Sequence, residues 1–146
     1  MKKKVITHNQ EETMNLAAEI AGKLQGGEVL ALNGELGGGK TTFTKGLAEA
    51  LRVEETITSP TFVMLKNYDG KIDKKNIQFV HIDAYRADTI EDIKSIGIED
   101  YLGRDDVVMV VEWAKKIQEI LPSDIINIEF KFVDENSREI TYDFGN

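Results

Sequence analysis

Residues 34–41 carry glycine, lysine and threonine at a spacing that is typical of a phosphate-binding loop. They read Gly34-Glu35-Leu36-Gly37-Gly38-Gly39-Lys40-Thr41, which fits the pattern G-x-x-x-x-G-K-[ST] in full. The glycines let the backbone turn tightly and aim its N–H groups at phosphate oxygens. We expect Lys40 to reach the outer phosphates and the Thr41 hydroxyl to ligate Mg²⁺. The motif therefore predicts that the chain binds a nucleoside triphosphate.

The segments that flank this loop have the character that the motif requires. Residues 28–33 are mostly apolar and suit a buried strand, and residues 42–51 suit a helix. The positive end of that helix would add to the anion site. A glycine-rich turn that binds nothing is the alternative, but such a turn needs neither the lysine nor the threonine.

Two carboxylates follow apolar strands and could complete the site. Asp83 ends the run at residues 77–83, and Glu112 ends the run at residues 107–112. Phosphate loops use an acidic residue at the end of a neighbouring strand to organise Mg²⁺, where parallel strands open onto their ligand. Either carboxylate could bind the ion, directly or through water, while the other positions a hydrolytic water. A surface carboxylate at a strand end is the alternative for each.

A hydroxyl-rich segment, Thr58-Ser59-Pro60-Thr61-Phe62, comes after the helix of the phosphate loop. In nucleotide switches a segment of this kind supplies a hydroxyl to the γ-phosphate or to Mg²⁺. Serine, proline and threonine are also ordinary turn residues, so a plain turn remains the alternative.

Polar and aromatic residues crowd around the two carboxylates. Strand alternation puts His81, Asp83 and Tyr85 on one face, with Arg86 just beyond them. Arg86 could neutralise phosphate charge, bind a partner or form a local salt bridge. Trp113 could pack in the core, or it could form a wall of the active site or of a partner surface.

Length and charge limit the classes of function that remain. The chain has 146 residues, 26 of them acidic and 18 basic, and a net charge of −8. This length predicts one domain over residues 1–146. The chain has no cysteine, which excludes disulfides, thiolate metal sites and cysteine nucleophiles. A protein that grips RNA alone presents a basic face, so any RNA here is expected to be held by another subunit. No apolar stretch approaches membrane-spanning length, and we expect a soluble, cytoplasmic protein.

The hydrophobic pattern places these motifs on alternating strands and helices. Asn9 is expected to cap a helix, and Glu12 is expected to complete its capping box. This helix is expected to end at Gly26-Gly27. Further strands are expected at residues 5–7, 61–68, 77–83 and 107–112, and the strand at 61–68 is expected to turn at Asp69-Gly70. Short helices broken by Gly97 are expected at residues 88–102. A hairpin is expected at residues 125–133 and 139–144. The pattern predicts an α/β protein with a central mostly parallel sheet, helices on both faces and an antiparallel C-terminal hairpin.

Together these segments resemble the TsaE (YjeE/YdiB) family, the P-loop ATPases of bacterial tRNA threonylcarbamoyladenosine biosynthesis. The resemblance covers most of the chain, in the order of the family. Its segments are Gly34-Glu35-Leu36-Gly37-Gly38-Gly39-Lys40-Thr41-Thr42, Thr58-Ser59-Pro60-Thr61-Phe62, His81-Ile82-Asp83-Ala84-Tyr85-Arg86 and Val111-Glu112-Trp113.

The resemblance implies an ATPase that uses ATP and Mg²⁺ and works with the proteins TsaB and TsaD. In this family TsaB and TsaD transfer a threonylcarbamoyl group to adenosine 37 of tRNA, so the ATPase meets tRNA only indirectly. Its hydrolysis is weak alone, rises in the complex, and is thought to reset that complex between rounds.

The resemblance also implies roles for the residues that match the family motifs. Lys40 would hold phosphates, Thr41 and Glu112 would bind Mg²⁺, Thr42 would support the loop, and Asp83 would contact the Mg²⁺ or γ-phosphate region. Residues 58–62 would form the switch, and Trp113 would lie near the nucleotide or partner surface. His81, Tyr85 and Arg86 would belong to the same switch or partner surface.

The last hairpin departs from the family pattern. Where the family often has Gly-Arg near the adenine, this chain has Ser137-Arg138. Asn9 and Thr13 are expected to complete an adenine pocket with these two residues.

A small-molecule or nucleoside kinase is the alternative function, because such kinases share the same loop. They normally carry an arginine-rich lid, whereas this chain has four arginines, Arg52, Arg86, Arg104 and Arg138, and no segment that resembles a lid. A non-catalytic nucleotide-gated module is a third interpretation. A GTPase is disfavoured because the chain has no Asn-Lys-x-Asp motif to read guanine.

Overall fold

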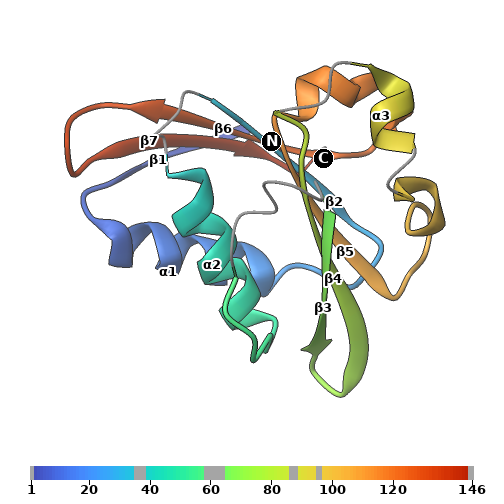
Figure 1. The fold of residues 1–146 in the computed structure, drawn as a ribbon. Coiled ribbons are helices and arrows are strands. Elements are labelled where there is room, and N and C mark those ends of the chain that lie inside the picture. Colours follow the sequence, from blue (N-terminus) through green and yellow to red (C-terminus); the bar gives the residue numbers. More distant parts are fainter. Residues whose placement is uncertain (1, 35–38, 58–64, 86–88, 95–96, 145–146) are drawn as a thin grey trace.

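The apolar strand that ends at Glu112 lies inside a seven-stranded sheet with the order β1-β7-β6-β2-β5-β4-β3 (Figure 1). The computed structural model describes residues 2–34, 39–57, 65–85, 89–94 and 97–144. The strands are β1 (Lys2–Thr7), β2 (Val29–Gly34), β3 (Leu65–Ile72), β4 (Lys75–Asp83), β5 (Val107–Glu112), β6 (Ile126–Phe132) and β7 (Arg138–Asp143).

The middle of the sheet is parallel and both of its sides are antiparallel. Strand β2 runs parallel to β5 and to β6, and β4 runs parallel to β5. The β6–β7 hairpin, the β1–β7 pair and the β3–β4 hairpin are antiparallel. The predicted parallel centre and C-terminal hairpin are confirmed. The antiparallel β3 edge was not predicted.

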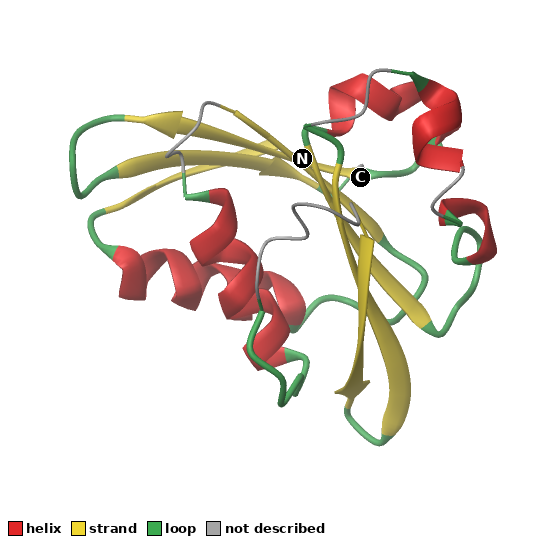
Figure 2. Cartoon of the chain, in the orientation of Figure 1, coloured by secondary structure: helices red, strands yellow, loops and turns green. Residues whose placement is uncertain are grey.

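Helical segments cover both faces of the sheet, as predicted (Figure 2). They are α1 (Gln10–Ala21), α2 (Lys40–Ala50), α3 (Ile90–Lys94) and the short 3₁₀ segments η1 (Ile98–Asp100) and η2 (Ala114–Ile120). Strand alternation divides the core in two: Leu30 and Leu32 of β2 pack toward α1 and α2, whereas Val29 and Ala31 pack toward η1 and η2. No helix among the described residues is long and apolar enough to cross a bilayer.

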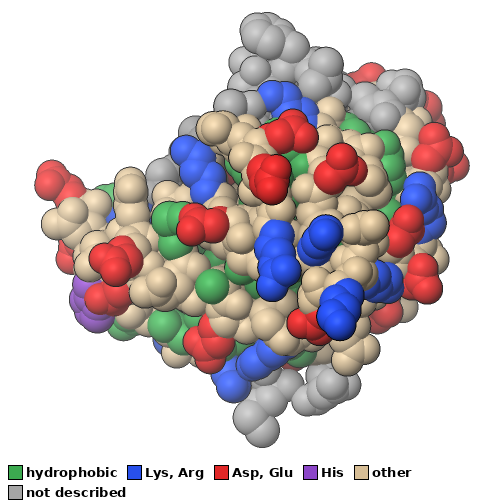
Figure 3. All heavy atoms as spheres, turned by 90° about the horizontal axis from the view of Figure 1, so that it is seen from below, with side chains coloured by type: hydrophobic (Ala, Val, Ile, Leu, Met, Phe, Trp, Pro, Cys, Tyr) green, Lys and Arg blue, Asp and Glu red, His purple; other side chains and the backbone are tan. Residues whose placement is uncertain are grey.

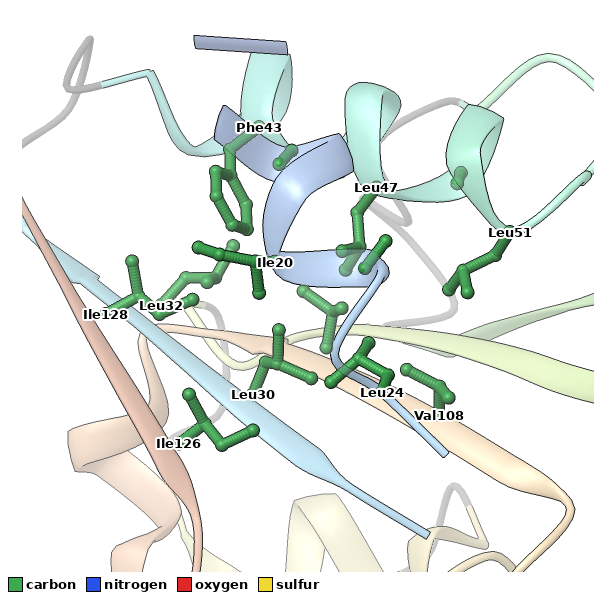
Figure 4. Packing of buried hydrophobic residues seen from close by; sticks show 14 of the residues in the cluster. Ile20, Leu24, Leu30, Leu32, Phe43, Leu47, Leu51, Val108, Ile126 and Ile128 are labelled. Atoms are coloured by element: carbon green, nitrogen blue, oxygen red, sulfur yellow. The ribbon is translucent and has the colours of Figure 1, made fainter. Parts of the chain in front are cut away.

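The core under α1 and α2 fixes where α2 begins. Figure 4 shows apolar side chains from both helices directed at β2, β5 and β6. Phe43 of α2 is fully buried and meets Phe130 of β6 edge-to-face, with 5.4 Å between ring centroids. This packing holds the first turn of α2 above the ends of the central strands.

The first helix is capped nearly as predicted. The Asn9 side chain accepts from the Glu12 amide at 2.8 Å, which confirms the cap. The Glu12 carboxylate, however, accepts from the amide of His8 rather than from that of Asn9. Helix α1 also ends at Ala21, before the predicted stop at Gly26-Gly27.

The predicted turn at Asp69-Gly70 is wrong, because β3 continues through both residues to Ile72. The chain turns instead at Asp73, whose φ is 53°. Gly70 is needed for close packing, because a Cβ there would lie 2.8 Å from the Leu51 carbonyl oxygen. That oxygen accepts from the Lys71 amide at 2.6 Å, so the glycine lets the strand pass close to the end of α2.

Strands β1 and β3 form the two edges of the sheet. Lys2, Lys3 and Lys4 on β1 are exposed. On the molecular face shown in Figure 3, Lys and Arg side chains lie among Asp and Glu side chains. Charges of both signs are therefore interspersed there, unlike the basic surface that a nucleic-acid backbone requires.

The contact between α1 and α2 depends on Gly46. A Cβ at this position would lie 2.8 Å from Met14 Cα and 2.9 Å from the Met14 carbonyl oxygen. We expect Gly46→Ala to lower the free energy of unfolding by about 1–2 kcal/mol, although alanine favours helix formation, because the two backbones must separate. Urea denaturation measures this change. Gly22→Ala is the control, since its Cβ would meet backbone at an ordinary 3.4 Å. Equal stability of the two variants would contradict the close packing.

Candidate nucleotide-binding site

The sheet register brings both candidate carboxylates to one place. Asp83 of β4 is paired with Glu112 of β5, and Glu112 is also paired with Leu32 of β2. Because these strands are parallel, their carboxyl ends form one edge, and β2 leaves that edge at Gly34. Two carboxylates and the start of the phosphate loop thus converge, as the sequence predicts.

Helix α2 begins at the same edge with the lysine and threonine of the motif. Gly39 precedes it with φ 97°, a left-handed conformation that glycine adopts without strain. Lys40, Thr41 and Thr42 form the first turn, whose unpaired N–H groups favour anions. The cavity in front of this turn has a volume of about 600 Å³. Its walls are Asn9, Gln10, Thr13, Gly39, Lys40, Thr41, Thr42, Asp83, Tyr85, Glu112, Trp113, Glu135, Asn136 and Arg138.

The amine of Lys40 is buried at the centre of this edge, with 5% of the residue exposed. Its Nζ donates to the Gly34 carbonyl at 2.7 Å and lies 4.4 Å from the centroid of the Trp113 ring. Burial lowers the pKa of Lys40, while the negative charges of Glu112 and Asp83 act in the opposite direction. The lysine amine thus contacts a carbonyl and an aromatic face, and it feels the negative charge of two carboxylates.

Trp113 reaches Lys40 through an uncommon backbone conformation. Its φ of 61° and ψ of 39° are left-handed, which is rare for a bulky residue. The Trp113 amide donates to the Leu32 carbonyl at 3.1 Å, and the Asn33 side chain accepts from the Lys115 amide at 3.3 Å. These bonds tie the chain after β5 to the end of β2. The sequence allows Trp113 either in the core or in a site wall, and the structure places its half-buried ring in the wall of the cavity.

A second aromatic ring continues this wall to the surface. Tyr85 is 48% exposed, and its ring centroid lies 5.0 Å from that of Trp113. Lys116 donates from its amine to the Tyr85 carbonyl and lies 5.3 Å from the Tyr85 ring centroid. The wall therefore runs from the buried lysine out to an exposed aromatic edge.

The two carboxylates are held in different ways. Asp83 is partly exposed, and its Oδ1 accepts from the Tyr85 amide at 2.9 Å. Glu112 is only 5% exposed, and its Oε2 lies 2.6 Å from Nε2 of His81. Hydrogen bonding to a backbone N–H or to an imidazole leaves each carboxylate a second oxygen for other partners.

The expected place of His81 at a switch or partner surface does not agree with its burial. His81 is fully buried on the face of β4 that packs toward α1 and α2, where it meets Glu112. Alternation correctly put it on the same face as Asp83. Its depth beneath that residue could not be read from the pattern.

The far end of the cavity is formed by α1 and the β6–β7 hairpin, where adenine-pocket residues were expected. Asn9, Thr13 and Arg138 line it. The Thr13 hydroxyl lies 2.7 Å from that of Thr7, and Arg138 Nη1 donates to the carbonyls of Asp134 and Ser137 at 2.7 and 2.9 Å. Ser137 itself is not among the residues of the cavity wall. Gln10, Glu135 and Asn136 are in that wall and were missed, because polar loop residues carry no motif.

Several predicted residues lie outside the described part of the chain. They are Glu35, Leu36, Gly37 and Gly38 of the phosphate loop, Thr58, Ser59, Pro60, Thr61 and Phe62 of the expected switch, and Arg86. Their expected roles stay predictions.

The buried amine of Lys40 makes stability depend on pH in a defined direction. A charged amine that loses water on folding destabilises the folded state wherever lysine is protonated in both states. We expect Lys40→Met, which keeps the bulk without the charge, to melt at a higher temperature than the wild type at pH 7. As pH rises from the lowered pKa of Lys40 toward 10.5, the pKa of an ordinary lysine, the folded wild type loses this proton and with it the cost of a buried charge. The difference in melting temperature between the wild type and Lys40→Met then narrows.

Thermal melts followed by circular dichroism, at pH 7 and near pH 10.5, measure this difference in melting temperature. Lys45→Met, on an exposed position of α2, is the matched control and should change the melting temperature little. A lower melting temperature for Lys40→Met at pH 7 would mean that the carbonyl, ring and carboxylates outweigh the cost of burial.

Comparison with known proteins places this architecture in one family. The family described as "Threonylcarbamoyl adenosine biosynthesis protein TsaE" matches residues 7–140. The tRNA threonylcarbamoyladenosine biosynthesis proteins TsaE of Bacillus subtilis and Aquifex aeolicus are 38% and 39% identical, over 93% and 94% of this chain and 82% and 93% of theirs. The crystal structure of Bacillus subtilis YdiB is similar with a TM-score of 0.80 and 35% identity, over 97% of this chain and 84% of that one. The chain has the P-loop NTPase fold and belongs to the TsaE family.

Proposed function

We propose that this protein is a Mg²⁺-dependent ATPase that serves threonylcarbamoyladenosine modification of tRNA together with TsaB and TsaD. The observation that carries this proposal is the meeting, in one cavity, of the first turn of α2 with the paired carboxylates Asp83 and Glu112. Its relatives bear the name of this biosynthesis, which supports the same pathway here.

The phosphates would bind against the first turn of α2. The N–H groups there carry partial positive charge, and the adjacent Lys40 supplies a full charge in a site of low dielectric. A triphosphate would compete with the Gly34 carbonyl for the Lys40 amine, which now donates to that carbonyl at 2.7 Å. The Trp113 ring, 4.4 Å from the amine, keeps the lysine directed along this wall.

The donor set fits Mg²⁺ held partly by nucleotide. This ion takes oxygen ligands and usually binds one or two carboxylates together with substrate phosphates. Thr41, Asp83 and Glu112 line the cavity with oxygens. No group of three or more His, Cys, Asp or Glu side chains among the described residues could hold a metal alone. When bound, Mg²⁺ would neutralise charge on the phosphate oxygens.

The carboxylates would divide two tasks between them. One would hold the ion, and the other would accept a hydrogen bond from the attacking water and orient it toward the γ-phosphate. Glu112 is the more rigid of the two, because it is buried and hydrogen-bonded by His81. This rigidity favours Glu112 for the metal and Asp83 for the water.

The purine would occupy the far end of the cavity, between α1 and the β6–β7 hairpin. Asn9, Gln10 and Asn136 offer amide groups there, and Arg138 offers a guanidinium plane. A guanidinium stacks well on an aromatic face, as this one does 4.9 Å from the Phe132 ring centroid.

The partners would act on the exposed aromatic edge. Tyr85 connects the surface to Trp113 and so to Lys40, and γ-phosphate loss would change contacts near residues 58–62. The net charge of −8 suits a subunit whose partners carry the tRNA. Hydrolysis would then reset the complex.

The alternative is a kinase that uses the same phosphate loop for a small-molecule or nucleoside acceptor. The wall of the cavity includes a single arginine among the described residues, Arg138. Kinases of this type use several arginines around the transferred phosphate, so this composition favours hydrolysis.

Loss of the Lys40 charge should remove hydrolysis. We expect Lys40→Ala to lower the rate of ATP hydrolysis by at least about 100-fold, because a preorganised charge on the phosphates is lost. Hydrolysis is measured with Mg²⁺, alone and with purified TsaB and TsaD, and should be slow alone and rise sharply with the partners. Lys45→Ala, on the exposed side of α2, is the matched control.

Three outcomes would contradict parts of this proposal. Unchanged hydrolysis in Glu112→Ala would remove the metal assignment. Hydrolysis that ignores TsaB and TsaD would leave a P-loop ATPase without this pathway, and fast phosphate transfer to a metabolite would establish the kinase.

The purine end can be tested through Arg138. We expect Arg138→Met to raise the Kd for ADP by roughly 5- to 30-fold, the loss of about 1–2 kcal/mol from a charged hydrogen-bonding group. Binding of inorganic pyrophosphate, followed by the same calorimetric titration, should not change. Lys131→Met, exposed on the neighbouring strand, is the control. Equal weakening of ADP and pyrophosphate would move Arg138 to the phosphate end.

A further inference from the structure

We infer that His81 is a positioning residue, which fixes the Glu112 carboxylate for Mg²⁺ binding. This inference rests on the proposed function and adds to it a residue that lies beneath the cavity rather than in its wall. It touches neither phosphate nor metal, and it acts through Glu112.

The sheet places these two side chains diagonally on one face. His81 is paired with Val110 across β4 and β5, and Glu112 follows Val110 by two residues. Side chains two apart on a strand share a face, so the imidazole points at the carboxylate of the next layer. The distance of 2.6 Å between Nε2 and Oε2 makes this a short hydrogen bond.

The imidazole is the donor in this bond. An ionised carboxylate only accepts hydrogen bonds, so Nε2–H of His81 donates to Oε2 of Glu112. One oxygen of Glu112 is thereby held from below, and rotation about the end of its side chain is restricted. The second oxygen remains for the cavity that Glu112 lines.

A purely structural role explains this histidine poorly. Its surroundings are apolar, with Phe79 two residues earlier on β4 and Val110 across the pair, and both are fully buried. Its Nδ1 is buried without a hydrogen-bond partner among the described residues. A buried polar atom without a partner is unfavourable, so an apolar side chain would suit the core better. What only the histidine contributes is the donor to Glu112.

Hydrogen bonds of this kind matter to metal ligands in general. A ligating carboxylate keeps its orientation through its own hydrogen bonds, and removal of such a partner typically weakens metal affinity by about 10–100-fold. We expect the same range for the affinity of this site for Mg²⁺ in the presence of ADP.

A matched pair of substitutions isolates the donor. Glutamine and methionine have similar length and flexibility, but His81→Gln keeps an N–H donor and His81→Met removes it. The measurement is binding of a fluorescent ADP analogue as Mg²⁺ is titrated, with a second titration in EDTA. We expect His81→Met to need about 10–100-fold more Mg²⁺, His81→Gln to stay close to the wild type, and affinity in EDTA to be unchanged in both.

Two controls separate positioning from loss of stability. Val110→Ala weakens the same layer of the core without touching Glu112, and it should leave the Mg²⁺ titration unchanged. In a Glu112→Gln background, His81→Met should add no further loss of Mg²⁺ affinity, because the carboxylate that it positions is gone.

The inference is overturned if His81→Met titrates with Mg²⁺ like the wild type, or if Val110→Ala shifts the titration equally. It is also overturned if His81→Gln behaves like His81→Met. A wild-type protein whose ADP binding ignores Mg²⁺ would instead overturn the proposed function itself.

Discussion

The candidate site is arranged around one buried positive charge, the Lys40 amine, at the end of the parallel strands. An amine that loses water needs compensation from dipoles and charges nearby. Here the Gly34 carbonyl, the Trp113 ring and the carboxylates of Asp83 and Glu112 provide it. These groups come from the ends of three strands, with Glu112 and Trp113 both at the end of β5, so the amine connects β2, β4 and β5 at the point where a ligand would enter.

The buried charge of Lys40 accounts for several local features that are unfavourable by themselves. The left-handed backbone of Trp113 turns its ring toward the lysine immediately after β5 ends. The buried pair of His81 and Glu112 brings a polar contact into an apolar layer. Strain and buried polarity of this kind cluster at functional sites, where the surrounding packing maintains them. The fully buried Phe43 and its neighbours in Figure 4 supply that packing under α2.

Local chemistry made the phosphate loop and the two strand-end carboxylates predictable, since their spacing and apolar flanks lie within a few residues of one another. The pairing of β1 with β7 was not predictable, because it joins opposite ends of the chain. The turn predicted at Asp69-Gly70 is wrong for a related reason. Glycine is needed there because the Leu51 carbonyl, distant in sequence, lies close to Gly70, and not because the chain turns. The partnership of His81 with Glu112 likewise requires the strand register, which periodicity alone does not contain.

The lysines of β1 lie at one edge of the sheet, where they affect its pairing with another chain. A strand that is paired on one side only offers its free backbone groups to another chain, and natural edges are often protected by charge. Lys2, Lys3 and Lys4 lie on such an edge, where β7 pairs with β1 from one side. Two copies that met edge to edge would bring these like charges together. Electrostatic repulsion thus opposes growth of the sheet from copy to copy and guards the protein against aggregation through this strand.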